Sequence, residues 1–128
     1  MLEVGMKGRQ ETLVTAQNTA KTYCSGALEV FATPAMIGLM EQTAFELVQP
    51  YLEEGQGTVG TVVNVTHDAP TPIGMKVWCE ATLTAIEGRK LVFRVEAFDE
   101  CGKIGGGVHE RFIIFSEKFQ VKANAKKA

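Results

Sequence analysis

The chain has 128 residues, with 13 lysines and arginines against 15 aspartates and glutamates, which gives a formal net charge of −2 at pH 7. This length favours a single domain, residues 1–128, with a sizeable core. The weakly acidic balance, with a pI near 5.7, argues against nucleic acid as the main partner, and no apolar run reaches the about 20 residues of a membrane span.

The three cysteines, Cys24, Cys79 and Cys101, are odd in number and show no C-x-x-C spacing. No signal peptide is visible, so we expect reduced thiols in a cytoplasmic protein. A free cysteine is usually a small buried hydrophobe, and none of the three is interpreted as a nucleophile.

The N-terminal part of the chain predicts one strand and a connector. Residues 9–22 are rich in threonine and valine, which favours a strand, with a break near Asn18. Residues 23–31 follow as a connector, with Gly26 as its flexible point.

Residues 32–52 predict the one long helix. Thr33 followed by Pro34 is typical of a helix start, because a threonine hydroxyl can accept a hydrogen bond from a first-turn N–H and proline loses nothing at the first helical position. We expect the helix to be amphipathic and to lie on a core, and Pro50 to kink or end it near Gln49. The apolar face comprises Met36, Met40, Ala44, Leu47 and Tyr51, and the polar face Gln42, Glu46, Gln49 and Glu53.

Glu41 lies away from the polar face of this helix. Its neighbours three and four residues away are Ile37, Gly38, Ala44 and Phe45. A carboxylate in such surroundings is partly desolvated, which favours its neutral form and prepares it for acid or base work near neutral pH. The alternative is that Glu41 lies at the shoulder of the apolar face and reaches out to water.

Alternating patterns after the helix predict a sheet. Four strands are expected, at residues 58–67, 75–86, 90–98 and 103–115. Gly60 marks a bulge or a close approach to the backbone, and residues 68–74, with two prolines and a glycine, form a loop. The polar end, residues 116–128, predicts a flexible basic tail. With the first strand, the pattern gives an α+β domain in which a five-stranded antiparallel sheet is wrapped around one central helix.

Two histidines are candidates for chemistry. His67 closes the second strand, where an imidazole suits proton transfer or polarisation of a carbonyl; an ordinary surface position is the alternative. His109, beside Glu110 and Arg111, is interpreted as structural. No metal site is recognised, because the histidines are 42 positions apart without H-x-x-x-H or paired cysteines. The glycines at residues 105–107 suggest a close backbone approach to a ligand or a neighbouring subunit, with simple crowding as the alternative.

Several long, ordered segments match a known family. They are EVFATPAMIGLMEQ, PYLEEGQGTVGT, VTHDAPTPIGM, IEGRKLVFRVEAFDE and IGGGVHER. In these segments the sequence resembles the hot-dog-fold acyl-CoA thioesterases and, within them, the fluoroacetyl-CoA thioesterase-like branch. The resemblance covers residues 28–122 and implies hydrolysis of a short-chain acyl-CoA to the free acid and coenzyme A. It implies no separate cofactor, since coenzyme A is part of the substrate.

The resemblance also implies site residues. The family places a threonine at the helix start, a glutamate eight residues on and a histidine after the second strand, which here are Thr33, Glu41 and His67. It points to Gly60 as a backbone position at the acyl group. On one straight helix Thr33 and Glu41 would lie about 12 Å apart. Because hot-dog proteins are typically dimers, we expect a homodimer whose sites are built from both chains.

Specificity and alternatives complete the hypothesis. Arg89 and Lys90 are candidate contacts for the coenzyme A phosphates, with solvated charge as the alternative. Pro34 stands where the family has glycine, and Cys24 and Ala27 replace bulky aromatic residues, so we expect a roomier site and a short acyl group other than fluoroacetyl. A non-catalytic acyl-CoA binder and a hot-dog dehydratase are the rival functions on the same fold.

Overall fold

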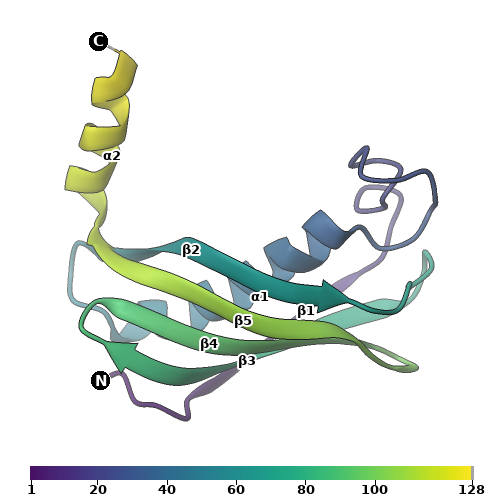
Figure 1. The fold of residues 1–128 in the computed structure, drawn as a ribbon, viewed down its shortest axis with the longest axis horizontal. Coiled ribbons are helices and arrows are strands. Elements are labelled where there is room, and N and C mark those ends of the chain that lie inside the picture. Colours follow the sequence, from purple (N-terminus) through teal and green to yellow (C-terminus); the bar gives the residue numbers. More distant parts are fainter. Residues whose placement is uncertain (128) are drawn as a thin grey trace.

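The computed structural model describes residues 1–127 and shows one sheet that curls around a long helix (Figure 1). Neighbouring strands are antiparallel, in the order β1-β3-β4-β5-β2, so β1 and β2 form the edges. The elements are β1 (Lys7–Leu13), α1 (Thr33–Val48), β2 (Gln56–His67), β3 (Lys76–Glu87), β4 (Lys90–Asp99), β5 (Gly102–Phe115) and α2 (Ser116–Asn124), with short 3-10 helices at Gln49–Tyr51 and Ala125–Lys127. The predicted α+β architecture is confirmed.

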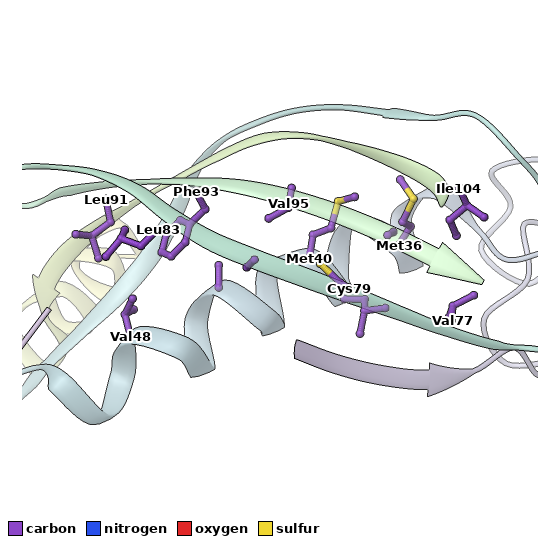
Figure 2. Close-up of a cluster of buried hydrophobic side chains, with 14 of the residues drawn as sticks. Met36, Met40, Val48, Val77, Cys79, Leu83, Leu91, Phe93, Val95 and Ile104 are labelled. Carbon is purple, nitrogen blue, oxygen red and sulfur yellow. The ribbon is translucent and has the colours of Figure 1, made fainter. Parts of the chain in front are cut away.

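The hydrophobic core lies between α1 and the sheet (Figure 2). On the predicted apolar face of the helix, Met36, Met40 and Ala44 are buried, whereas Tyr51, beyond the end of α1, is exposed. The alternation predicted for β3 is equally clear, with buried side chains at Val77, Cys79, Ala81 and Leu83. Full burial of a large apolar side chain contributes about 1.5–3 kcal/mol, so this packing fixes the position of α1 against the sheet.

The start of α1 differs from the prediction. The capping residue is Ala32, and no side chain caps the helix; Thr33 is already helical, with Pro34 beside it. Thr33 Oγ1 instead lies 2.7 Å from His67 Nδ1, so the hydroxyl is used in a tertiary contact rather than a local one. At the other end, Pro50 falls in the 3-10 turn that follows α1, as expected from its missing N–H.

The first strand is shorter than the predicted residues 9–22 and ends at Leu13. The Asn18 side chain donates a hydrogen bond to the Leu13 carbonyl (3.0 Å) and accepts one from the Thr15 N–H (2.9 Å). Local side-chain bonds of this kind compete with a strand ladder. The chain therefore follows turns from there to α1.

The edge strand β2 carries the irregularity that Gly60 predicts. Its pairing with β5 shifts register between Gly60 and Val62, which is a β-bulge. The side chains of Val62 and Val63 are 42% and 40% exposed in this single copy. β2 therefore offers another chain an unpaired and partly apolar edge.

The prediction of a flexible tail at residues 116–128 is wrong for its described part. The segment forms α2, which projects away from the sheet (Figure 1). None of the α2 residues is buried, so its sequence signal is helix propensity rather than an apolar stripe. The strong helix formers are Glu117, Lys118, Gln120, Lys122 and Ala123. Within residues 1–127, no helix has the length and hydropathy needed to cross a membrane.

Candidate active site

Glu41 and Gly60 face each other where α1 passes beneath β2. A Cβ atom added at Gly60 would lie 2.5 Å from Glu41 Oε2, closer than real atoms approach. The missing side chain therefore makes room for the carboxylate. The Glu41 side chain is 43% exposed, so it is partly covered and still open to a ligand.

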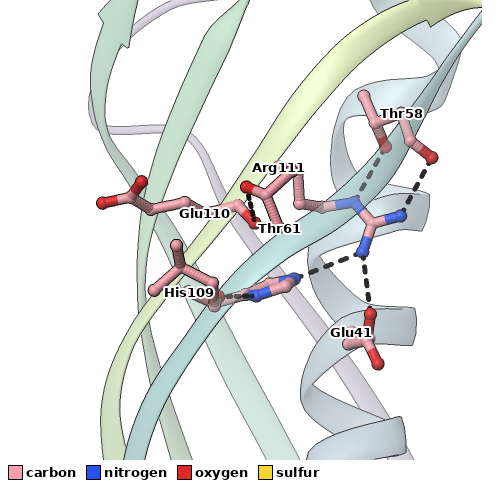
Figure 3. Close-up of polar contacts among 7 residues, drawn as sticks. Glu41, Thr58, Thr61, His109, Glu110 and Arg111 are labelled. Carbon is pink, nitrogen blue, oxygen red and sulfur yellow. Dashed lines mark hydrogen bonds and ion pairs between the residues drawn. The ribbon is translucent and has the colours of Figure 1, made fainter.

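Arg111 of β5 holds this carboxylate from the buried side (Figure 3). Its side chain is 7% exposed, and its Nη1 lies 3.5 Å from Glu41 Oε2. Nε donates to Thr58 Oγ1 (2.8 Å) and Nη2 to the Thr58 carbonyl (3.0 Å). Burial lowers the pKa of the guanidinium, an effect that the charge of Glu41 opposes. Glu41 thus has a fixed cationic neighbour, which the apolar helix pattern alone does not reveal.

His109 completes this network and is itself buried. Its Nε2 lies 3.2 Å from Arg111 Nη1, and its Nδ1 lies 2.8 Å from the carbonyl oxygen of Val62 (Figure 3). Burial lowers the pKa of this imidazole, and the nearby Arg111 charge lowers it further. The histidine is therefore neutral at pH 7.

A second polar cluster lies at the start of α1. Thr33 Oγ1 is 2.7 Å from His67 Nδ1, so the structure brings these two predicted residues together. His67 Nε2 is buried and has no hydrogen-bond partner among residues 1–127, which is uncommon for a buried polar atom. Burial lowers the pKa of His67, against a smaller opposing effect of Asp68. A neutral imidazole with a free nitrogen suits proton exchange with a ligand.

The two clusters do not meet within one copy of the chain. Thr33 and Glu41 are eight residues apart on a continuous helix, which places them about 12 Å apart along its axis. No hydrogen bond or ion pair among the described residues links Glu41 to Thr33 or His67. One copy therefore holds two separate polar clusters.

The predicted phosphate contacts lie elsewhere, at the turn between β3 and β4. Lys90 Nζ is 3.2 Å from Glu87 Oε1 and 3.9 Å from Glu110 Oε1, so its charge is already matched by carboxylates. The Arg89 guanidinium lies 5.4 Å from the centre of the Phe112 ring. Neither residue belongs to the Glu41 or the His67 cluster.

The sequence interpretation missed Thr58 and Arg111 and treated His109 as structural. The signal was present in β5, where His109, Arg111 and Ile113 alternate and are all buried. An arginine on the buried face of a strand requires polar partners there. The period-two rule places these three side chains on one face of β5, although it does not identify Glu41 as the partner of Arg111.

A five-stranded antiparallel sheet wrapped around one long helix is the hot-dog fold. The family model described as fluoroacetyl-CoA-specific thioesterase, FlK, matches residues 14–117. The chain therefore belongs to this family. The predicted hot-dog fold and the enzyme class, thioester hydrolase, are thereby confirmed.

Individual relatives agree with this family. The chain is 49% identical over 98 residues to the fluoroacetyl-CoA thioesterase of Streptantibioticus cattleyicolor, a match over 77% of this chain and 70% of that protein. A solved structure of the fluoroacetyl-CoA thioesterase FlK superposes with a TM-score of 0.92 at 40% identity, over 98% of each chain. A thioesterase superfamily member from Thermus thermophilus superposes with 0.91 at 32% identity, over 99% of this chain and 94% of that one.

Proposed function

We propose that the protein hydrolyses a short-chain acyl-CoA to the free acid and coenzyme A. The observation that carries this proposal is the Glu41 carboxylate held against the bare backbone of Gly60. Gly60 is exposed, so a thioester can approach its backbone from the solvent. Two relatives are fluoroacetyl-CoA thioesterases by name, which supports an acyl-CoA as the substrate class.

In the proposed reaction, the thioester carbonyl oxygen lies near the N–H of Gly60, which stabilises the negative charge that develops on it. Glu41 either takes a proton from the water that attacks the carbonyl carbon, or attacks that carbon itself to give an anhydride that water then opens. The C–S bond breaks, and the leaving thiolate accepts a hydrogen bond from His67 Nε2–H and takes up the proton released by the attacking water, so that His67 stays neutral. The Thr33 hydroxyl donates to His67 Nδ1 and so leaves the proton on Nε2.

Single turnover in ¹⁸O-labelled water separates the two routes. Direct attack by water places the label only in the released acid. The anhydride route places label in the Glu41 carboxylate when water opens the anhydride at the enzyme acyl carbon. Mass spectrometry of the peptide that contains Glu41 gives the result.

We propose a homodimer in which each site takes Glu41 and Gly60 from one copy and Thr33 and His67 from the other. The exposed edge of β2 supports this arrangement. If β2 pairs antiparallel with its counterpart about an axis just after Val63, His67 lies opposite the partner's Gly60. The two half-sites of each copy would then be completed across the interface.

Mixing two inactive variants tests the shared site. In a Glu41→Gln and His67→Asn heterodimer, one site carries both substitutions and the other carries neither. A 1:1 mixture that exchanges subunits freely should recover about a quarter of the wild-type activity, since half the dimers are mixed and half their sites are intact. A site confined to one copy gives no recovery, and full activity in a strictly monomeric protein also contradicts the proposal.

The acyl preference follows from the small residues Cys24 and Ala27, which are exposed in the connector before α1. We propose a roomier acyl site than one closed by aromatic side chains. A thiol-release screen over short, branched, halogenated and aromatic acyl-CoAs tests this, with release from at least one short-chain substrate expected. Binding without release favours a non-catalytic binder, and conversion of a 3-hydroxyacyl-CoA to the enoyl product favours a dehydratase.

For the coenzyme A phosphates we propose Arg89 ahead of Lys90. Arg89 lines a groove with Lys118 and Lys122 that contains no carboxylate, whereas Lys90 is paired with Glu87. Arg89→Ala is expected to raise KM about threefold, the effect of one exposed ionic contact. Lys90→Ala is the matched control and should leave KM unchanged.

We further propose a cytoplasmic location. The thiols of Cys24, Cys79 and Cys101 are all free, which suits a reducing compartment. Cell fractionation with an antibody to the protein tests this proposal, and recovery outside the cytoplasm contradicts it.

A further inference from the structure

His109 is a buried titratable group that the proposed hydrolysis does not use. Its side chain is 1% exposed, and its ring lies 6.1 Å from the ring of Phe93, centre to centre. Both ring nitrogens nevertheless have polar partners, Val62 and Arg111. A side chain that served only to fill space would not need a hydrogen bond at each ring nitrogen. The two partners of His109 therefore indicate its role.

These partners fix the state of the ring. The Val62 carbonyl oxygen can only accept, so His109 Nδ1 must carry a hydrogen. The Arg111 guanidinium can only donate, so His109 Nε2 must present its lone pair. The neutral Nδ1–H tautomer alone satisfies both contacts, and a doubly protonated imidazolium would place a donor against a cation.

The position of the ring joins two features of the candidate site. Val62 is the residue at which β2 resumes its pairing after the bulge that contains Gly60. His109 Cε1 would lie 3.3 Å from a Cβ atom added at Gly60, so the imidazole also forms a wall of that space. The same ring also contacts Arg111 Nη1, which is the nitrogen that lies against Glu41.

We propose that neutral His109 is a positioning residue that locks the Arg111 guanidinium against Glu41 and ties the Gly60 bulge to the same network. The expected effect on kcat rests on the proposed hydrolase function. The hydrogen bonds of His109 can be tested without measuring turnover. Arg111 Nη1 has two acceptors, His109 Nε2 at 3.2 Å and Glu41 Oε2 at 3.5 Å. The two bonds to Thr58 hold Nε and Nη2 and leave a rotation about the line between them. Without the His109 bond, this rotation can carry Nη1 away from the carboxylate.

Three substitutions at this position separate positioning from packing. His109→Gln places an amide oxygen near the Nε2 position and can still accept from Arg111. His109→Asn can still donate to Val62 but is too short to reach the guanidinium. His109→Phe fills the space beside Phe93 and makes neither bond.

We expect His109→Gln to keep kcat within about threefold of wild type, and His109→Asn and His109→Phe to lower kcat by about 10- to 100-fold, the effect of losing a hydrogen bond to a charged group. KM should change much less, because Arg111 is buried behind Glu41. In a protein that already carries Arg111→Gln, the His109→Asn substitution should lower kcat little further, since both substitutions remove the same hydrogen bond. Equal kcat in the Phe and wild-type proteins, with both folded by circular dichroism, overturns the proposal.

A measurement independent of turnover separates this inference from the proposed function. Nitrogen NMR of wild-type protein at pH 7 should show His109 protonated at Nδ1 only, and slow rotation of the Arg111 guanidinium. That slow rotation should persist in His109→Gln and be lost in His109→Asn. Protonation at Nε2, or a guanidinium equally mobile in all variants, overturns the inference even if the enzyme is active. An inactive wild-type protein with these NMR signatures refutes the hydrolase proposal and leaves the locked network standing.

Discussion

The two ends of the functional stretch of α1 are built differently. At the helix start, Thr33 and His67 share one hydrogen bond, and His67 Nε2 has no partner among the described residues. Two turns further on, Glu41 lies against Arg111, which has four acceptors from three different elements. A rigid, satisfied network suits a group that must be held at a fixed point, and an unsatisfied nitrogen suits a group that awaits a ligand.

Glu41→Gln is expected to give the largest loss, with kcat lowered about 10²-fold or more, because general acid–base or nucleophilic chemistry needs the charged carboxylate. The amide is isosteric and can still accept from Arg111, so the network should survive. Thiol release under saturating acyl-CoA measures the effect. A variant with the wild-type rate removes Glu41 from the mechanism.

Gly60→Ala tests the space beside that carboxylate. A methyl group would lie 2.5 Å from Glu41 Oε2 and 3.3 Å from His109 Cε1, so the carboxylate must shift. A displacement near 1 Å in an active site can cost about 10²-fold, and by that rule we expect the turnover rate to fall by about 10- to 100-fold. In a protein that already carries Glu41→Gln, Gly60→Ala should lower the turnover rate far less. An equal loss of rate in both proteins would show that Gly60→Ala does not act through Glu41.

The looser end of the helix should be more tolerant. Thr33→Val removes the hydroxyl that holds His67 and is expected to lower kcat about fivefold, the effect of one neutral hydrogen bond of about 1 kcal/mol. Thr33→Ser keeps the hydroxyl and should recover most of the rate. A serine variant as poor as the valine variant would assign the role of Thr33 to its methyl group.

The sequence was sufficient for the parts of the fold that depend on local pattern. The four strands after α1, the bulge at Gly60 and the apolar face of α1 follow from periodicity and from glycine or proline chemistry. The cap at Thr33 failed because a tertiary partner, His67, engages the same hydroxyl. The helix α2 was missed because an exposed helix has no apolar stripe to detect.

The candidate site could be predicted only in part, for a related reason. Glu41 and His67 came from the family resemblance together with an acid among apolar neighbours. Arg111 contacts Glu41 across 70 positions of sequence, and no local pattern pairs them. Its burial depends on the inward face of β5, which is known only once the register with β2 is fixed.

The pH dependence of stability sharpens the comparison between the two clusters, since each contains a neutral histidine. Burial lowers the pKa of His67 and of His109 below the ordinary value of 6.5, against opposing carboxylates that include Asp68 and Glu41. Below pH 6.5 the unfolded chain therefore binds protons that the folded protein does not. The free energy of unfolding falls as the pH falls, by at most about 1.4 kcal/mol per pH unit for each histidine, and neither contributes a slope above pH 7.5.

Urea unfolding at pH 5.5, 6.5 and 7.5, at one fixed protein concentration because a dimer is expected, measures this slope. Glutamine does not titrate, so His109→Gln should remove the part of the slope that comes from the cluster of His109, Arg111 and Glu41. His67→Gln should remove the part that comes from the cluster of Thr33 and His67. At His109 the Arg111 charge adds to the effect of burial, whereas the Val62 carbonyl, Glu41 and Glu110 oppose it. If neither substitution flattens the slope, both imidazoles are free to protonate in the folded state, and the neutral tautomer that links Val62 to Arg111 does not persist in solution.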